Sequence, residues 1–274
     1  MPDLVEKIES AMKEIRKSYK ARPEVAIILG TGLGGLATEI EKKTVIRYES
    51  IPHFPRPTLE AHAGNLVCGT LSGKEVVAME GRFHFYEGYT PEEITLPVRV
   101  MKMLGAGVLI VSNACGGMNP HYRTGDIVVV EDHINLMGFN PLIGPNDERL
   151  GPRYPDMCEP YDLKLVRLVE EIALKNAIRA HRGVYVGVAG PNLETRAEYR
   201  FLKTIGADVV GMSTVPEVLV AVHMGMKVVG LSIVTDICLP DALKPANIEE
   251  IIRVANEAEP KLTKIVKELV RQLP

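Results

Sequence analysis

The chain has 274 residues, of which 46% are hydrophobic and 24% are charged, and its formal net charge is -3. These values are typical of a folded globular protein and exclude disordered and fibrous classes. The weakly negative charge removes the electrostatic case for nucleic acid or an anionic membrane as the main partner. We therefore expect any anion-binding site to be local.

The four cysteines are widely spaced and form no CxxC pair. This spacing indicates neither a zinc site nor a disulfide framework, so we expect reduced thiols and a cytoplasmic location. No stretch approaches the ~20 apolar residues that a membrane-spanning helix needs. The sequence also contains no HExxH or comparable ligand spacing, so we expect no metal.

The predicted secondary structure alternates between strands and helices. An amphipathic helix comes first, with apolar residues from Val5 to Ile15 among charged ones. Apolar, β-branched runs then predict strands at 25–29, 75–79, 108–111, 127–130, 184–188, 209–211 and 228–234. Helical spacing of apolar residues predicts helices at 91–104, 161–175, 194–205 and 215–223, and a long C-terminal helix that includes 251–269.

Alternating strands and helices predict an α/β fold around a largely buried sheet. No low-complexity tract, internal repeat or flexible linker divides the sequence, so residues 1–274 are interpreted as a single domain. The segment 133–160 is rich in proline and glycine and lacks periodicity. Loops of that length are usually functional or interfacial, so we expect this one to contact a neighbouring subunit.

A glycine-rich turn, Gly-Thr-Gly-Leu-Gly-Gly at 30–35, follows the first predicted strand, and a helix is expected after it. Such a turn presents backbone N–H groups to an anion with no side chain in the way. Gly30, Gly32 and Gly35 also match the dinucleotide pattern GxGxxG, and Glu49 lies where an acidic ribose ligand is expected. An NAD-dependent oxidoreductase and a tight turn without a ligand are therefore both alternatives.

Polar and small residues follow the other predicted strands. GRFHFYEGY follows the strand at 75–79, and SNACGGMNP, interpreted as a second anion-binding turn, follows the strand at 108–111. Ligands of open α/β sheets collect at the carboxyl ends of strands, so we expect these loops to converge on one pocket. Arginine, histidine and hydroxyl groups there suit a phosphate, and Glu194 and Asp236 suit a polar, planar group. A hydride-transfer enzyme needs no second phosphate-binding cluster, which disfavours the oxidoreductase.

The motifs together resemble the trimeric, low-molecular-mass class of purine nucleoside phosphorylases over nearly the whole chain. The resemblance rests on the glycine turn and on GRFHFYEGY (81–89), SNACGGMNP (112–120), HINLMGFNPLIGPNDERLGPRYP (133–155), VAGPNLET (188–195) and GMSTVPEV (211–218). It implies a single-domain α/β fold with a mixed central sheet flanked by helices. It also implies phosphorolysis of purine (2′-deoxy)ribonucleosides to free base and (deoxy)ribose 1-phosphate, with inorganic phosphate as co-substrate, no cofactor and a homotrimer.

The resemblance also assigns site residues. The positions that match its phosphate site are Thr31, Arg82, His84, Ser213 and the backbone N–H of Ala114, with His62 near the phosphate. Tyr86, Met212 and Ile248 match positions at the ribose, and Asn113, Leu193, Glu194 and Asp236 match positions at the base. His84, Glu194 and Asp236 are the expected catalytic residues. Tyr154 matches an aromatic residue that reaches into the adjacent subunit's site.

Two positions depart from the family pattern. Asp236 stands where 6-oxopurine-specific members have asparagine, and Ile248 stands where the family has a histidine at the ribose 5′-hydroxyl. Both changes point towards an S-methyl-5′-thioadenosine phosphorylase, which is an alternative function. Asn113 and Glu194 follow the nucleoside phosphorylase pattern, however, and Cys238 breaks the aspartate pair of that relative. We therefore expect inosine and guanosine as main substrates and adenosine as a further one. A phosphate-binding sensor without turnover is a third hypothesis.

Overall fold

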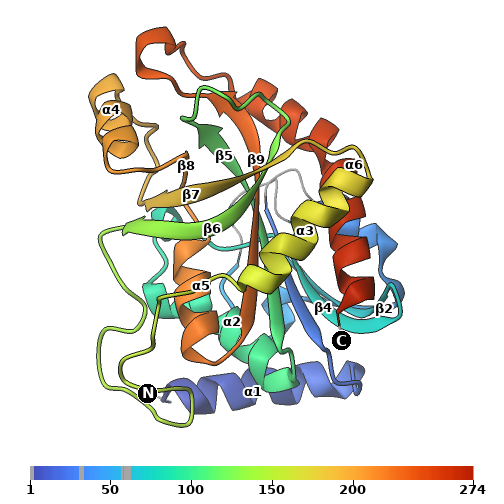
Figure 1. Cartoon of the computed structure of the whole chain (residues 1–274). Helices are drawn as coiled ribbons and strands as arrows, with labels where there is room; N and C mark the ends of the chain where they lie inside the picture. Colours follow the sequence, from blue (N-terminus) through green and yellow to red (C-terminus); the bar gives the residue numbers. More distant parts are fainter. Residues whose placement is uncertain (1–2, 31–33, 57, 59–62, 274) are drawn as a thin grey trace.

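The computed structural model describes residues 3–30, 34–56, 58 and 63–273. Within these residues a nine-stranded sheet runs through the molecule, and helices pack around it (Figure 1). The strands are β1 (Val25–Leu29), β2 (Glu41–Arg47), β3 (Asn65–Leu71), β4 (Lys74–Glu80), β5 (Val108–Gly117), β6 (Ile127–Leu136), β7 (Ala180–Val188), β8 (Val209–Gly211) and β9 (Lys227–Ile237). The α-helices are α1 (Leu4–Ser18), α2 (Pro91–Leu104), α3 (Leu163–Lys175), α4 (Arg196–Thr204), α5 (Val215–His223) and α6 (Ile248–Gln272). Short 3-10 helices are η1 (Gly34–Glu39), η2 (Tyr48–Ser50), η3 (Phe85–Glu87) and η4 (Pro240–Ala242).

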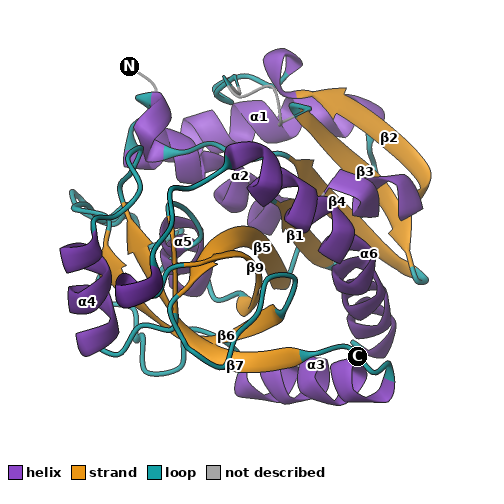
Figure 2. Cartoon of the chain, turned by 90° about the horizontal axis from the view of Figure 1, so that it is seen from above, coloured by secondary structure: helices purple, strands orange, loops and turns teal. Residues whose placement is uncertain are grey.

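The sheet is mixed, as predicted. Strand β1 runs parallel to β4 and β5, whereas β2, β3 and β4 form an antiparallel meander. Strands β5, β8, β7, β6 and β9 pair in that order, and β9 also pairs with β5, so these five close into a ring. Figure 2 shows β6 and β7 curving around β5 and β9. The predicted α/β fold is therefore confirmed.

The helices bury apolar residues against the sheet or against one another, and α5 is buried on nearly all sides. Helix α1 buries Val5, Ile8, Ala11 and Ile15 and contacts α2, which in turn contacts α5. Helix α6 packs on β9 and α3, and burial of apolar surface is the main stabilising term for this layer. Among the described helices, none combines the length and the apolar character that crossing a membrane requires.

Two turn predictions were wrong. The chain after the glycine turn forms only the short helix η1 and then enters β2, so no α-helix begins there. The segment 112–117 is not a turn but the second half of β5, because its small residues continue to pair with β9 and, at Gly116 and Gly117, with β8. Only the residues from Met118 onward leave the sheet.

Other boundaries also differ from the prediction. Strand β6 extends to Leu136, so the irregular segment predicted from 133 begins four residues later. Strands β2 and β3 were not predicted; most of β2 is exposed and charged, which hides the apolar pattern of a strand. Helices α3 and α4 each begin two residues later than predicted, at the side-chain caps Asp162 and Thr195.

Candidate functional site

A cavity of about 490 Å³ lies at the carboxyl ends of β1, β4, β5, β8 and β9. This is where the sequence placed the converging loops. The structure brings most of the predicted site residues together in its lining, namely Arg82, His84, Tyr86, Asn113, Ala114, Leu193, Glu194, Met212, Ser213, Asp236 and Ile248. The cavity is thus lined by residues from segments far apart in the sequence.

The other predicted residues are Thr31, His62 and Tyr154, together with Glu49 of the dinucleotide alternative. Thr31 and His62 lie outside the described residues. Tyr154 is 87% exposed in the single chain, and its predicted contact with an adjacent subunit stays a prediction. Glu49, the acidic ribose ligand of the dinucleotide alternative, forms an exposed ion pair with Arg47 and does not line the cavity.

Arg82 is a buried cation with unused hydrogen-bonding capacity. Its side chain is 2% exposed, and its Nη1 donates to Ser213 Oγ at 2.8 Å. Its Nε lies 3.3 Å from Glu217 Oε1, which partly balances the charge. Among the described residues, Nε and Nη2 have no hydrogen-bond partner. Because unsatisfied buried donors are costly, this guanidinium is prepared to bind an anion in the cavity.

The backbone at Thr214 holds the hydroxyl groups next to Arg82. Thr214 has φ 71° and ψ -54°, and the N–H of Val215 donates to the Ser213 carbonyl at 2.8 Å. These values describe a γ-turn with positive φ, a rare and strained conformation. It points Ser213 Oγ at Arg82 and brings Thr214 Oγ1 within 2.9 Å of Asn113 Nδ2. The turn therefore holds the Ser213 hydroxyl against Arg82 and the Thr214 hydroxyl against β5.

His84 is oriented by Glu87, one turn further along the chain. His84 Nδ1 lies 2.9 Å from Glu87 Oε1, and its ring stacks on Tyr86 with 4.7 Å between ring centroids. Burial alone would raise the pKa of Glu87, but hydrogen bonds from His84 and Thr58 lower it to about 2. The ionised Glu87 thus selects the tautomer of His84 that keeps its proton on Nδ1.

Gly30 is the part of the glycine turn that the structure shows lining the cavity. A Cβ atom here would lie 2.9 Å from both the Cα of Asn113 and the carbonyl oxygen of Ser112. Only glycine therefore allows the end of β1 to approach β5 this closely. Gly35 instead packs against the side chain of Glu259 on α6, away from this cavity.

Glu194 and Asp236, which we call the carboxyl pair, face the same cavity. A bulge in the pairing of β9 with β5 inserts Thr235 and aligns Asp236 with Gly116. Asp236 Oδ1 accepts from Thr235 Oγ1 at 2.9 Å, and its Oδ2 accepts from Cys238 Sγ at 3.0 Å. Burial raises the pKa of Glu194, and the nearby charges of Glu198 and Asp236 raise it further. Glu194 therefore takes up a proton more readily than a free carboxyl group, and both members of the pair can hydrogen bond with a bound polar ring.

An apolar surface borders the carboxyl pair. The first turn of α6 contributes Ile248, Ile251 and Ile252, and Leu193 adds a further aliphatic side chain. Ile248 is largely exposed in the single chain. This part of the cavity offers no side-chain donor or acceptor from α6, so it suits an apolar substituent better than a hydroxyl group.

Several lining or supporting residues were not predicted. Glu87 and Glu217 support His84 and Arg82, and Tyr199 lines the cavity beside Glu194. The signal for Glu87 was a carboxylate three residues after a site histidine, and for Glu217 a single charge in the otherwise apolar α5. Tyr199 gave no such signal, because a tyrosine on an amphipathic helix is usually a core residue.

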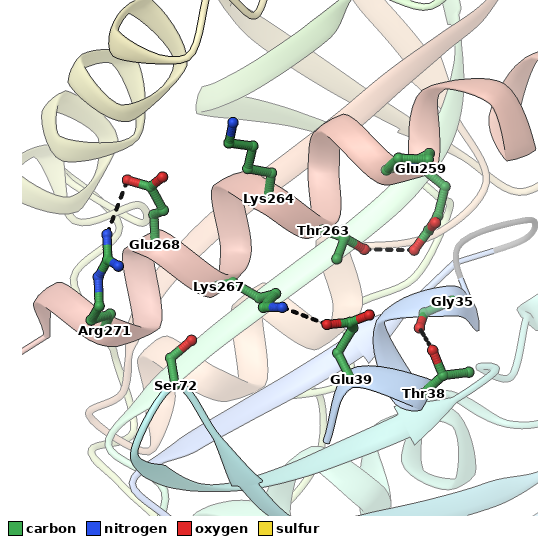
Figure 3. Close-up of a pocket in the computed structure, with 11 residues that line it drawn as sticks. Gly35, Thr38, Glu39, Ser72, Glu259, Thr263, Lys264, Lys267, Glu268 and Arg271 are labelled. Atoms are coloured by element: carbon green, nitrogen blue, oxygen red, sulfur yellow. Dashed lines mark hydrogen bonds and ion pairs between the residues drawn. The ribbon is translucent and has the colours of Figure 1, made fainter. Parts of the chain in front are cut away.

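Another cavity, of about 520 Å³, lies between η1 and α6 (Figure 3). Its charged groups are mostly paired with one another, Lys267 with Glu39 and Arg271 with Glu268. We therefore do not assign it a function. Among the described residues, no group of three or more histidine, cysteine or acidic side chains is arranged to hold a metal ion.

Comparisons with known proteins agree with this site. The model of the Phosphorylase superfamily matches residues 24–271. The chain is 50% identical to purine nucleoside phosphorylase 1 of Bacillus subtilis (strain 168), over 97% of this chain and 98% of the relative. Crystal structures of the Schistosoma mansoni purine nucleoside phosphorylase with adenosine and with inosine both give a TM-score of 0.94, at 43% and 42% identity. They cover 98% of this chain and, respectively, 98% and 97% of the solved chains.

Proposed function

We propose that this chain, which belongs to the Phosphorylase superfamily, catalyses the phosphorolysis of purine nucleosides to a free purine base and (deoxy)ribose 1-phosphate. The observation that carries the proposal is the buried Arg82, which lines one cavity with the carboxyl pair and whose Nη2 has no hydrogen-bond partner among the described residues. Relatives named purine nucleoside phosphorylases match almost the whole chain, which supports the same reaction.

The phosphate is the nucleophile in this reaction. Arg82, His84, Ser213 and the backbone N–H of Ala114 are proposed to hold it below C1′ of the ribose, together with Thr31 and His62. A phosphate oxygen then forms a bond to C1′ as the bond from C1′ to the base nitrogen breaks. The anion stabilises the positive charge that develops on the sugar, and its fixed position supplies much of the rate enhancement.

The leaving base gains electron density as its bond to the sugar breaks. Asp236 in its protonated form is proposed to donate a proton or a hydrogen bond to N7, and Glu194 as a carboxylate accepts from N1–H. These residues line the same cavity, and we assign Asn113 and Leu193 to the base and Tyr86, Met212 and Ile248 to the ribose. Phosphate is a co-substrate, and no cofactor takes part in this scheme.

Inosine and guanosine are the proposed main substrates, and adenosine is a further one. A second candidate function, cleavage of S-methyl-5′-thioadenosine, is favoured by the apolar surface of Ile248, Ile251 and Ile252. Such a surface gains from burying a methylthio group and cannot hydrogen bond a 5′-hydroxyl.

We also propose a cytoplasmic homotrimer. The exposed Tyr154 lies in the irregular segment that follows β6, and an aromatic side chain exposed to this extent is well placed to enter a neighbour's site. The four cysteines form no disulfide, which fits a reducing compartment. Light scattering would measure the oligomeric state, and a monomer with full activity would contradict the role of Tyr154.

The decisive experiment measures release of free base from inosine, guanosine, adenosine and S-methyl-5′-thioadenosine, with and without inorganic phosphate. We expect phosphate-dependent release from the nucleosides. No release from any of them would refute an enzymatic function and favour a phosphate-binding sensor. A strong preference for S-methyl-5′-thioadenosine would replace the main assignment by the second candidate.

A further inference from the structure

Two buried side chains link the members of the carboxyl pair. Cys238 Sγ donates to Asp236 Oδ2 at 3.0 Å. Tyr199, on α4, lines the same cavity as Glu194. Its hydroxyl lies near enough to the Glu194 carboxyl group and the Cys238 thiol to lower the pKa of each. Tyr199 is 3% exposed and Cys238 is 1% exposed, so bulk water hardly competes for these bonds. Glu194, Tyr199, Cys238 and Asp236 therefore lie next to one another along one side of the cavity.

The backbone leaves room for this arrangement at Gly116. A Cβ atom on Gly116 would lie 2.7 Å from Cys238 Sγ and would displace the thiol from Asp236. The other oxygen of Asp236 accepts from Thr235 Oγ1. Each donor favours the ionised form of the carboxyl group that accepts from it. Tyr199 therefore acts on Glu194, and Cys238 acts on Asp236.

Each class of purine requires one donor and one acceptor from the carboxyl pair. A 6-oxopurine presents N1–H and the acceptors O6 and N7, so Glu194 has to accept and Asp236 has to donate. A 6-aminopurine presents N1 as an acceptor and an amino group as a donor, so the roles reverse. The pair carries one proton in both cases, and only the position of that proton differs.

We propose that Tyr199 and Cys238 are positioning residues that allow the carboxyl pair to hold its single proton on either member, so that both purine classes are accepted. The Tyr199 hydroxyl has one hydrogen and two acceptors. It donates to Glu194 when Glu194 is ionised and binds a 6-oxopurine. It donates to Cys238 Sγ when Glu194 is protonated, and the Cys238 thiol then supports the ionised Asp236 that binds a 6-aminopurine.

This inference rests on the proposed function and predicts opposite effects for two substitutions. Tyr199→Phe removes a donor to ionised Glu194 in the 6-oxopurine state and a donor to the Cys238 sulfur, a weak acceptor, in the 6-aminopurine state. The loss is larger in the first state, so the ratio of kcat/KM for adenosine to that for inosine should rise about threefold to tenfold. Cys238→Ala removes a donor from ionised Asp236, so the same ratio should fall about threefold to tenfold. These sizes correspond to the loss of one hydrogen bond to a charged group, reduced for the weak thiol donor.

Matched controls separate this effect from general loosening of the core. Tyr122→Phe removes a buried hydroxyl that donates to the Arg182 carbonyl, and Cys68→Ala removes a buried thiol in β3; neither residue lines the cavity. Both controls should leave the ratio within twofold of the unmodified enzyme. Cys238→Ser retains a donor and should restore the ratio. If Cys238→Ala does not fold, Cys238→Val removes the donor while filling the site.

The outcomes are distinguishable. Ratios that shift in the same direction in Tyr199→Phe and Cys238→Ala, or that stay within twofold in both folded variants, would overturn the inference while leaving phosphorolysis intact. Turnover of only one purine class by the unmodified enzyme would also overturn the inference, and the proposed function would still stand. Release of base from neither adenosine nor inosine would contradict the proposed function, and the inference would fail with it.

Discussion

Replacement of Arg82 by alanine should affect activity and stability through two separable causes. Arg82 supplies the unpaired N–H groups of the proposed phosphate site, and loss of a preorganised donor of this kind lowers the rate about 10²-fold to 10³-fold. The same change removes the cation that lies 3.3 Å from the buried Glu217 carboxylate. An uncompensated buried charge costs about 3–5 kcal/mol of unfolding free energy.

A double variant separates the two effects. Adding Glu217→Gln to Arg82→Ala removes the uncompensated charge, so most of the lost stability should return while the activity stays low. Urea unfolding measures the first quantity, and initial rates of base release over a range of phosphate concentrations measure the second. Recovery of activity along with stability would refute the reasoning, because it would mean that Arg82 is needed for folding and not for the phosphate.

Three further predictions follow from other contacts of the site. The pKa of Glu87 is lowered from 4.5 to about 2, so its ionised form stabilises the folded state above pH 4.5. This contribution to the free energy of unfolding is up to about 3 kcal/mol and is lost as the pH falls towards 2. Glu87→Gln should flatten this part of the profile of unfolding free energy against pH, and an unchanged profile would argue against the His84–Glu87 contact. Gly30→Ala should cost about 1–3 kcal/mol of stability and weaken phosphate saturation, because its Cβ would meet β5. Gly34→Ala, whose new Cβ has no described atom within 4 Å, should change stability by no more than about 0.5 kcal/mol and leave phosphate saturation unchanged. Ile248→His should raise the preference for inosine over S-methyl-5′-thioinosine about tenfold in kcat/KM, and an unchanged preference would remove Ile248 from the ribose site.

Local sequence patterns determined most of the elements and most of the site. Buried strands such as β1 and amphipathic helices such as α1 follow from apolar periodicity, which depends only on neighbouring residues. The site residues were identified because the motifs that carry them, such as GRFHFYEGY and GMSTVPEV, are contiguous. The carboxyl pair and the departures at Asp236 and Ile248 were likewise visible in the sequence alone.

Only the tertiary structure decided which residues support the site. The closing of β9 onto β5 and the bulge at Thr235 arise from pairing between segments more than 80 residues apart. The positive φ of Thr214 is a strained conformation that the surrounding fold maintains. The same holds for the contact of Glu217 with Arg82. A sequence pattern reports the preference of a residue for a local conformation, but the partner of a buried polar group is set by where the whole chain places the opposite side chain.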